Sequence, residues 1–291
     1  MIPHMNIVAW GQSVPWADPR QVEQDLIISR ALVELFNDPF LSAELRFRGG
    51  TALHKLHFPK PFRYSEDLDF VRTSAGPIGP VLDKIREILE PWLARANLDQ
   101  SPVAPKLRFR VPAEDKTSDV PIRLKIEINT RERTAYEPQR VIPFAVNNPW
   151  FSGRANIATF SNEEILATKL RALLQRDKGR DLIDLAHAIA VFETLDAARV
   201  VRCLKQYLDA AEQAISRAQA EQRMFAKLAN VDFMADVRPL LAAGEAEKFD
   251  DEAARAAFRT VFSAFINRLP GDAWALTGET AERLGMPELR G

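Results

Sequence analysis

The chain has 291 residues, of which 46% are hydrophobic and 27% are charged, and its formal net charge is −1. A chain of this size buries enough apolar surface to fold without disulfides or a structural metal. Its single cysteine, Cys203, excludes an internal disulfide and every zinc motif built on cysteine pairs. No apolar run approaches the ~20 residues that span a bilayer, and the N-terminal residues lack the order of a signal peptide. We therefore expect a cytoplasmic protein with no membrane partner, in which nucleic-acid binding requires a local basic patch.

Two kinds of sequence divide the chain. Residues 1–158 mix short alternating runs with helical stretches, whereas residues 159–291 carry long stretches rich in Ala, Leu, Arg and Glu with almost no alternation. The first pattern is typical of a domain that mixes strands and helices, and the second of a helical domain. The boundary is expected in the loop-like stretch 147–156.

Hydrophobic periodicity predicts the individual elements. In the first part they are a helix at 21–36, a strand at 44–50 that runs into a glycine turn, a helix at 51–58 with Thr51 as its N-cap, a strand at 65–71, a helix at 81–98, and a hairpin of strands 106–111 and 122–129 joined by a turn at 112–121. In the second part they are a helix at 162–176 capped by Ser161 and three helical stretches, 180–192, 197–229 and 250–269.

Carboxylates form the sharpest local pattern. In the stretch Ser-Glu-Asp-Leu-Asp, Asp67 and Asp69 are two apart on a predicted strand and therefore project from the same face. Two such carboxylates beside a glycine turn suit a hard cation such as Mg²⁺, although two solvated aspartates at an exposed strand edge would give the same pattern. Glu127 lies on the polar face of another predicted strand. A third carboxylate there would complete a site of the kind that catalyses phosphoryl and nucleotidyl transfer.

A glycine pair precedes these carboxylates in the stretch Arg-Gly-Gly-Thr, residues 48–51. Backbone N–H groups at such a strand-to-helix turn approach an anion closely, and the helix N-terminus adds a favourable field. The stretch is neither a Walker A loop nor a Rossmann fingerprint. On its own, a tight structural turn is the simpler interpretation.

Charged residues in two further places have both a functional and a structural interpretation. Lys169 lies near one edge of a mostly apolar predicted helix, and Asp181 and Asp184 share a face of the next helix, where a surface salt bridge would explain them. The predicted hairpin carries five cations on the face that bears Glu127, which suits triphosphate or an RNA backbone but equally a solvated face. These cations are Lys106, Arg108, Arg110, Arg123 and Lys125.

The order of these patterns resembles one family. A helix with Glu23 and Asp25 is followed by FRGGTALHKL, RYSEDLDF, KIEIN and ATKLRALLQRDKGRDLIDL. Together they resemble the AbiEii/AbiGii-type toxin nucleotidyltransferases, of which the mycobacterial MenT toxins are relatives, over roughly residues 20–190. The combination of the glycine turn, the spaced aspartates and the distant Lys/Asp motif is far more specific than any one part.

The resemblance implies an α+β chain, with a DNA polymerase β-like nucleotidyltransferase domain that has a mixed sheet, followed by an all-helical domain. It also implies the toxin of a type IV toxin–antitoxin or abortive-infection module, with an AbiEi-like antitoxin encoded nearby. Members of the family transfer nucleotides from NTP, and several act on tRNA 3′ ends and block translation. The rival acceptors are another RNA, a protein or an antibiotic-like small molecule, and a different alternative is an inactive binding protein of the same fold.

The same resemblance implies roles for individual residues. It places Mg²⁺ on Asp67, Asp69 and Glu127. It places the NTP triphosphate at Gly49, Gly50, Thr51 and Ser65, with Arg48 where relatives often have a lysine. It gives Lys169, Asp184 and the additional member Asp181 the task of contacting nucleotide and ordering the site.

Overall fold

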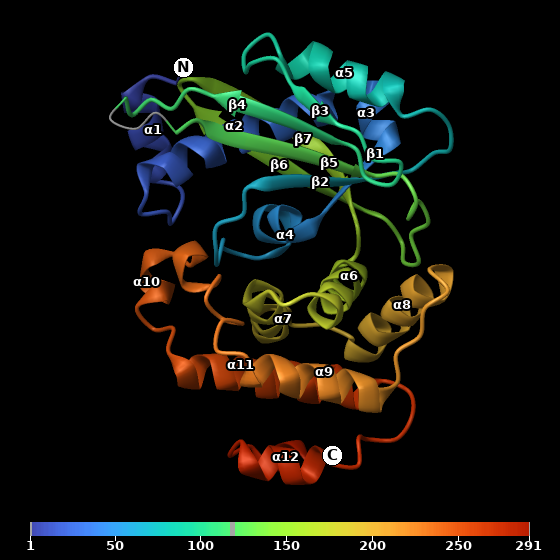
Figure 1. Ribbon diagram of the computed structural model, residues 1–291. Helices are drawn as coiled ribbons and strands as arrows, with labels where there is room; N and C mark the ends of the chain where they lie inside the picture. Colours follow the sequence, from blue (N-terminus) through green and yellow to red (C-terminus); the bar gives the residue numbers. More distant parts are fainter. Residues whose placement is uncertain (1, 117–119, 291) are drawn as a thin grey trace. The chain divides into compact units, whose positions relative to one another are not determined.

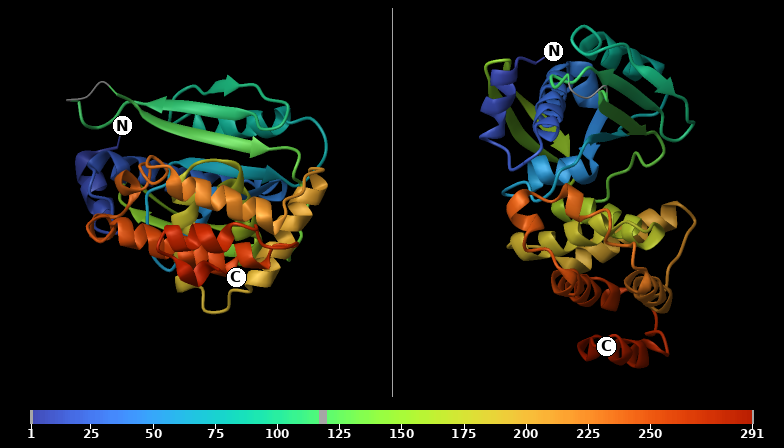
Figure 2. Two further views of the ribbon diagram at one scale, coloured as in Figure 1. Left: turned by 60° about the horizontal axis from the view of Figure 1, so that its bottom comes forward. Right: turned by 60° about the vertical axis from the view of Figure 1, so that its left-hand side comes forward.

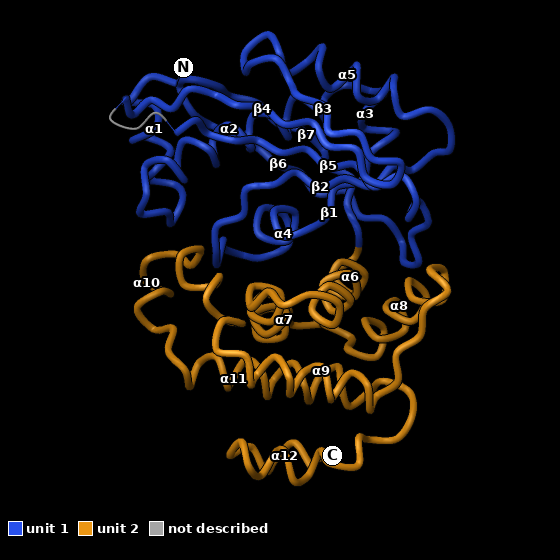
Figure 3. Tube along the Cα trace, viewed as in Figure 1, with its two compact units in different colours: residues 1–160 blue, residues 161–291 orange. Residues whose placement is uncertain are grey.

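The computed structural model describes residues 2–116 and 120–290, and the chain forms two compact units, Met1–Phe160 (unit 1) and Ser161–Gly291 (unit 2) (Figure 3). The turn expected at 112–121 therefore lies partly outside the described residues, because 117–119 are not among them. Within the described ranges, no helix is both long and apolar enough to cross a membrane.

A mixed sheet forms the centre of unit 1 (Figures 1 and 2). Its strands are β1 (Leu45–Arg48), β2 (Asp67–Arg72), β3 (Asn97–Asp99), β4 (Lys106–Val111), β5 (Ile122–Asn129), β6 (Arg140–Asn148) and β7 (Phe151–Thr159). Over the described residues, these strands make one seven-stranded sheet in the order β3-β4-β5-β2-β1-β7-β6. The pairs β2–β5 and β1–β7 are parallel and the other neighbours are antiparallel.

Helix α2 packs against the apolar face of this sheet. The helices of unit 1 are α1 (His4–Gly11), α2 (Pro19–Asn37), α3 (Pro39–Glu44), α4 (Gly49–Ala52), the π-helical turn η1 (Leu53–His57) and α5 (Gly79–Leu89). Asp18 caps α2 by accepting a hydrogen bond from the Arg20 N–H, and the helix packs on β5, β6 and β7. Phe36 of α2 lies 6.0 Å from Phe70 of β2, ring centre to ring centre.

The residues of β2 and β5 that are buried against the core determine which residues face the opposite side of the sheet. Leu68 and Phe70 of β2 are fully buried, and so are their register partners Ile126 and Ile128 of β5. Because side chains alternate along a strand, the residues between them face the opposite side of the sheet. This is the face that carries Asp69 and its neighbours.

Unit 2 is helical, as the sequence pattern predicts. Its helices are α6 (Asn162–Gln175), α7 (Gly179–Val191), α8 (Ala197–Ala210), α9 (Arg217–Ala229), η2 (Arg238–Leu240), α10 (Ala243–Ala246), α11 (Asp251–Ala264), η3 (Ile266–Arg268), α12 (Thr277–Arg283) and η4 (Pro287–Leu289). Ser161 caps α6 by accepting from the Glu164 N–H at 3.1 Å. Phe225 stacks against Phe258 and Phe262 at 6.0 and 5.3 Å, and this aromatic cluster is the centre of the core.

Three expected elements differ in unit 1. Thr51 is not an N-cap but lies inside α4, which begins at Gly49. The helix expected at 81–98 ends at Leu89, since Pro91 has no N–H to donate, and the edge strand β3 follows. The stretch 147–156 is not a loop. Asn148 ends β6 and its side chain accepts from the Trp150 N–H at 2.9 Å, so the Asn-Pro signal marks a tight turn between β6 and β7.

In unit 2, the helical stretch expected at 197–229 is divided. Helix α8 ends at Ala210 and α9 begins at Arg217, with Glu212 in the left-handed region at φ 54° between them. The signal for this break is the capping box Ser216–Gln219, in which each residue's side chain bonds the other's backbone N–H.

Candidate active site

The three predicted carboxylates lie on one face of two paired strands. Asp67 and Asp69 come from β2, and Asp69 is the register partner of Glu127 on the parallel strand β5. Partners in adjacent strands point to the same face. The pairing therefore brings Glu127 to the aspartates, a relation that the sequence pattern alone does not contain.

Two lysines occupy the space among these carboxylates. The Lys125 ammonium lies 2.8 Å from Asp67 Oδ2 and 3.6 Å from Glu127 Oε2, and Lys106 Nζ lies 3.5 Å from the same Glu127 oxygen. Among the described residues, no group of three or more His, Cys, Asp or Glu side chains converges closely enough to hold a metal ion as placed. The lysine ammonium groups therefore occupy the positions among the carboxylates that a bound metal cation would take.

The Asp69 carboxyl is less acidic than usual, mainly because it is buried. Burial raises the pKa of this carboxyl to about 6, and the charges of Asp67 and Glu127 contribute to the rise, while Lys125 and Arg48 oppose it. Oxygen ligands on one face with a surplus of negative charge are the donor set that a hard divalent cation prefers. The residues present therefore fit such an ion.

The glycine pair lies directly against this group. Gly49 has φ 83°, a conformation that favours glycine, and a Cβ at this position would overlap Asp69 Oδ2. A Cβ at Gly50 would lie 2.8 Å from Arg63 Nη2 and 3.0 Å from Ser65 Oγ. The backbone from 49 to 50 is therefore packed closely between the aspartate strand and the Ser65 segment.

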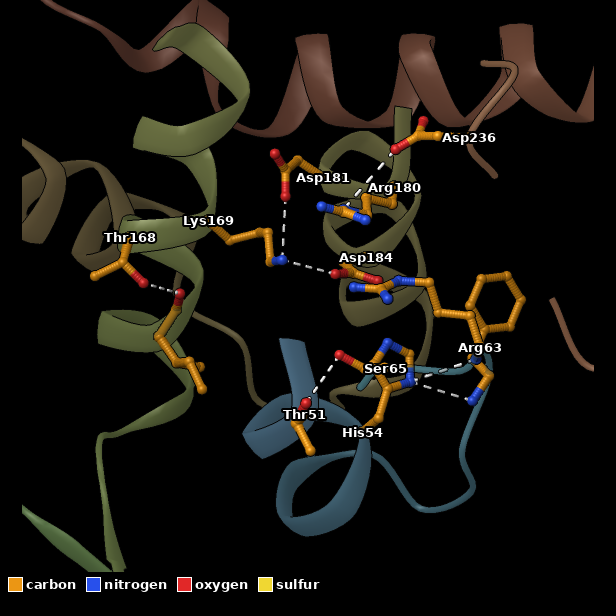
Figure 4. A network of polar contacts seen from close by, with 12 residues as sticks. Thr51, His54, Arg63, Ser65, Thr168, Lys169, Arg180, Asp181, Asp184 and Asp236 are labelled. Carbon is orange, nitrogen blue, oxygen red and sulfur yellow. Dashed lines mark hydrogen bonds and ion pairs between the residues drawn. The ribbon is translucent and has the colours of Figure 1, made fainter. Parts of the chain in front are cut away.

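Thr51 and Ser65 complete this end of the site. The Thr51 hydroxyl donates to the backbone carbonyl of Asp67 and is hydrogen-bonded to Ser65 Oγ at 2.9 Å (Figure 4). The hydrogen bonds of Thr51 tie the helix that begins at Gly49 to the start of β2. The predicted triphosphate residues Gly50, Thr51 and Ser65 are thus neighbours in space.

Arg48 is held by an acidic residue that follows β5. Its Nη1 donates to Glu132 Oε2 at 2.6 Å, and Asn129 Nδ2 also donates to that oxygen at 3.2 Å. Asn129 in turn accepts from the backbone N–H of Glu132 at 2.9 Å. Sequence reasoning missed Glu132, although an Asn three residues before it is a turn signal that the pattern does contain.

A small cavity of about 170 Å³ opens beside Thr51 and Ser65 and was not foreseen. Trp16 lines it, and its indole N–H has no hydrogen-bond partner among the described residues. The buried ion pair between Lys55 Nζ and Asp25 Oδ2, 2.9 Å long, lines another part. His54 is buried, and its Nδ1 accepts from backbone N–H groups rather than serving a metal.

In unit 2, Lys169 bridges two buried aspartates (Figure 4). Its Nζ lies 3.1 Å from Asp181 Oδ1 and 2.9 Å from Asp184 Oδ2, and both carboxylates are fully buried. Burial would raise the pKa of Asp181, but the charges of Lys169 and Arg176 hold that pKa below its usual value. Lys169 and the two aspartates form ion pairs, as a salt-bridge interpretation of the sequence predicts. The pairs are buried inside the unit and do not lie on its surface.

The five predicted cations of the hairpin share one face, as their cross-strand register requires. Lys125 and Lys106 form ion pairs with the carboxylates of Asp67 and Glu127, and Arg108 pairs with Asp99 at 3.2 Å. Arg110 and Arg123 are register partners and exposed, and over the described ranges no ion pair is recorded for either. The open part of the basic face is therefore smaller than the sequence suggests.

Comparison with known proteins gives one family match. The family described as "Nucleotidyl transferase AbiEii toxin, Type IV TA system" matches residues 30–264. No curated protein matches the sequence. Among solved structures, the chain is similar to MenT4, the nucleotidyltransferase toxin Rv2826c from Mycobacterium tuberculosis H37Rv. The TM-score is 0.58 at 18% identity, over 93% of this chain and 100% of MenT4.

JHP933 from Helicobacter pylori has a TM-score of 0.50 at 16% identity, over 93% of this chain and 99% of that one. At these identities, each likeness shows a shared fold. The mixed sheet followed by helices is therefore the α+β fold of nucleotidyltransferase toxins, as the resemblance implies.

Gly49→Ala tests the close approach of the turn to Asp69. The new Cβ overlaps the carboxylate and has an unfavourable φ, so we expect the free energy of unfolding to fall by about 1–3 kcal/mol in urea titration. Gly244→Ala is the matched control, because a Cβ there meets no atom within 4 Å. Equal stability of the two variants would show that the turn has room for a side chain.

Asp69→Asn tests the cost of burying the Asp69 charge beside the other carboxylates. The folded protein binds a proton at Asp69 more tightly than the unfolded chain, so its stability in EDTA rises as pH falls from about 7 toward 4. The neutral amide removes the penalty at pH 7, and we expect a gain of about 1–2 kcal/mol that shrinks at pH 5. Urea midpoints of wild type, Asp69→Asn and the exposed control Asp83→Asn measure it. A gain independent of pH would contradict the assignment.

Lys169→Met removes the cation that two buried carboxylates share. We expect a loss of about 3–5 kcal/mol in the free energy of unfolding, because uncompensated charge stays buried. Lys205→Met, an exposed lysine on α8, should change stability by no more than about 0.5 kcal/mol. A loss as small as that of the control would mean that the aspartates are solvated or protonated without difficulty.

Proposed function

The chain belongs to the AbiEii family of type IV toxin–antitoxin toxins and is a nucleotidyltransferase, and from this premise we propose that it moves NMP from an NTP to an RNA acceptor, the 3′ end of tRNA. The observation that carries the proposal is the register of Asp69 with Glu127, beside Asp67 and the Gly49 turn. Modification of the tRNA 3′ end would block aminoacylation and so translation.

Mg²⁺ is the metal that we propose for the site. Asp67, Asp69 and Glu127 would hold it, and when bound it would neutralise the charge of the NTP phosphates during transfer. Lys125 would then leave the carboxylates. Its flexible ammonium is suited to follow the negative charge from Asp67 to a phosphate oxygen.

The reaction itself is an in-line displacement at the α-phosphorus. The acceptor hydroxyl forms the new P–O bond, the bond to the bridging oxygen of the β-phosphate breaks, and pyrophosphate leaves. We assign Glu127 to accept the hydroxyl proton. The backbone N–H groups of Gly49 and Gly50, with the Thr51 and Ser65 hydroxyls, would bind the departing phosphates.

The acceptor would be held by cations. Arg110 and Arg123 lie side by side on the exposed part of the β4–β5 face and suit the phosphates of an RNA backbone. Arg48, held by Glu132, would orient a phosphate through its remaining N–H groups. Lys169 and Asp184, with Asp181, would contact nucleotide and order the site, as the resemblance implies.

A type IV module implies a cognate antitoxin. We propose that it is an AbiEi-like regulator encoded nearby. NTP and tRNA occur in the cytoplasm, where the proposed reaction would take place.

The test is transfer of label from each α-labelled NTP, in turn, to total bacterial tRNA with Mg²⁺. Asp67→Ala should lower the rate roughly 100-fold or more, because a cation ligand is lost. Asp83→Ala, an exposed aspartate on α5, is the matched control and should transfer at the wild-type rate. Label on tRNA in wild type and control, absent in Asp67→Ala, supports the proposal.

Other outcomes select the rival functions. Label on a protein or a small molecule, with none on tRNA, would replace the RNA acceptor but keep the enzyme. Binding of NTP with no transfer to any acceptor would favour a binding protein of the same fold. Full activity of Asp67→Ala would overturn the assignment of the site.

A further inference from the structure

A second cleft lies wholly within unit 2 and has a volume of about 640 Å³. It is formed by the C-terminal part of α6, by α8 and α9, and by the connection between α8 and α9. Sites for small ligands have volumes of roughly 300–1,000 Å³. No residue of this cleft belongs to the carboxylate group on β2 and β5.

The cleft exists because the helical stretch at 197–229 is broken. The connection 211–216 turns the chain back between α8 and α9, and Glu212 within it has φ 54°. A left-handed conformation is uncommon for a residue other than glycine. From this connection, Gln213, Ala214 and Ile215 line the cleft.

Positive charge predominates around the cleft. Among the described residues that line it, the cations are Arg171, Arg223 and Lys227, and the carboxylate is Asp177. Arg223 Nη1 donates to the Leu174 carbonyl at 3.1 Å, which leaves its other N–H groups at an exposed position. Lys227 Nζ pairs with Asp177 and so offsets that charge. The lining therefore favours an anionic ligand.

The rest of the lining consists mainly of aliphatic side chains and two glutamine amides. Leu174, Leu204 and Leu208 line the cleft and are buried, so its apolar part is aliphatic. Gln175 Nε2 donates to Gln213 Oε1 at 3.2 Å between two exposed side chains. The remaining donors and acceptors of these amides are of the type that read the edge of a base.

We propose that this cleft binds a nucleotide unit, as a second site beyond the transfer reaction. The base packs against the aliphatic side chains, the glutamine amides bond its edge, and Arg223 binds the phosphate, with Arg171 adding positive charge nearby. The same chemistry is offered by a free nucleotide and by one nucleotide of a single-stranded RNA.

Photocrosslinking to the full chain in EDTA tests the proposal. The probes are 8-azido-AMP and a single-stranded adenosine hexamer that carries one 8-azidoadenosine, and adducts are mapped by mass spectrometry. We expect adducts on residues 204–227. Arg223→Glu should lower this labelling at least about tenfold, whereas Arg202→Glu, the same charge change at an exposed position of α8, should leave it unchanged.

Ala214→Trp provides a second variant that fills the cleft without changing charge, and it should also abolish labelling. Labelling by 8-azido-AMP supports a free-nucleotide site, and labelling by the hexamer alone supports an RNA site. Absence of labelling on 204–227 with both probes overturns the proposal, and so does labelling that both Arg223→Glu and Ala214→Trp leave intact. Binding of an acidic peptide that the nucleotides do not displace would also overturn it.

Discussion

A concentration of like charge on one side of its sheet is the main constraint on unit 1. Asp67, Asp69 and Glu127 share a face that also carries the glycine turn, and their mutual repulsion must be offset by cations. Lys125 and Lys106 provide that offset. The apolar side of the same strands holds the arrangement together, because a slip of one residue in register would move the carboxylates into the core against α2.

Local alternation was sufficient to predict the faces of these strands. The pattern of β2 places the aspartates together, and that of β5 places Glu127 among basic residues, and the observed alternation of buried and open positions confirms both. The parallel pairing of β2 with β5 was not predictable in the same way, since it joins segments far apart in the sequence with no turn to set the register. For this reason the sequence predicts the two lysines as contacts for triphosphate or RNA, or as part of a solvated face, and does not predict the ion pair of Lys125 with Asp67.

Two connections in the chain differ from what the sequence pattern predicts. The Asn-Pro signal near Asn148 predicts a loop, whereas the structure has a tight turn, because a turn signal gives the position of a reversal and not the length of the connection. The apolar periodicity continues on both sides of Glu212, so periodicity alone does not predict that the helix ends there. The cap residues Ser216 and Gln219 carry the information there, because they satisfy N–H groups that exist only at a helix start.

The buried ion pairs of Lys169 in unit 2 are not explained by stability alone. Lys169 serves Asp181 and Asp184, and Arg176, whose side chain is half exposed, supplies a further ion pair to Asp181. Apolar residues of similar volume often stabilise an interior as well as such a group does, because they avoid the desolvation of charge. Stability alone is therefore a weak reason for these residues. Two fixed carboxylates do, however, restrict a flexible lysine to one position, and that restriction is what the proposed contact of Lys169 with nucleotide requires.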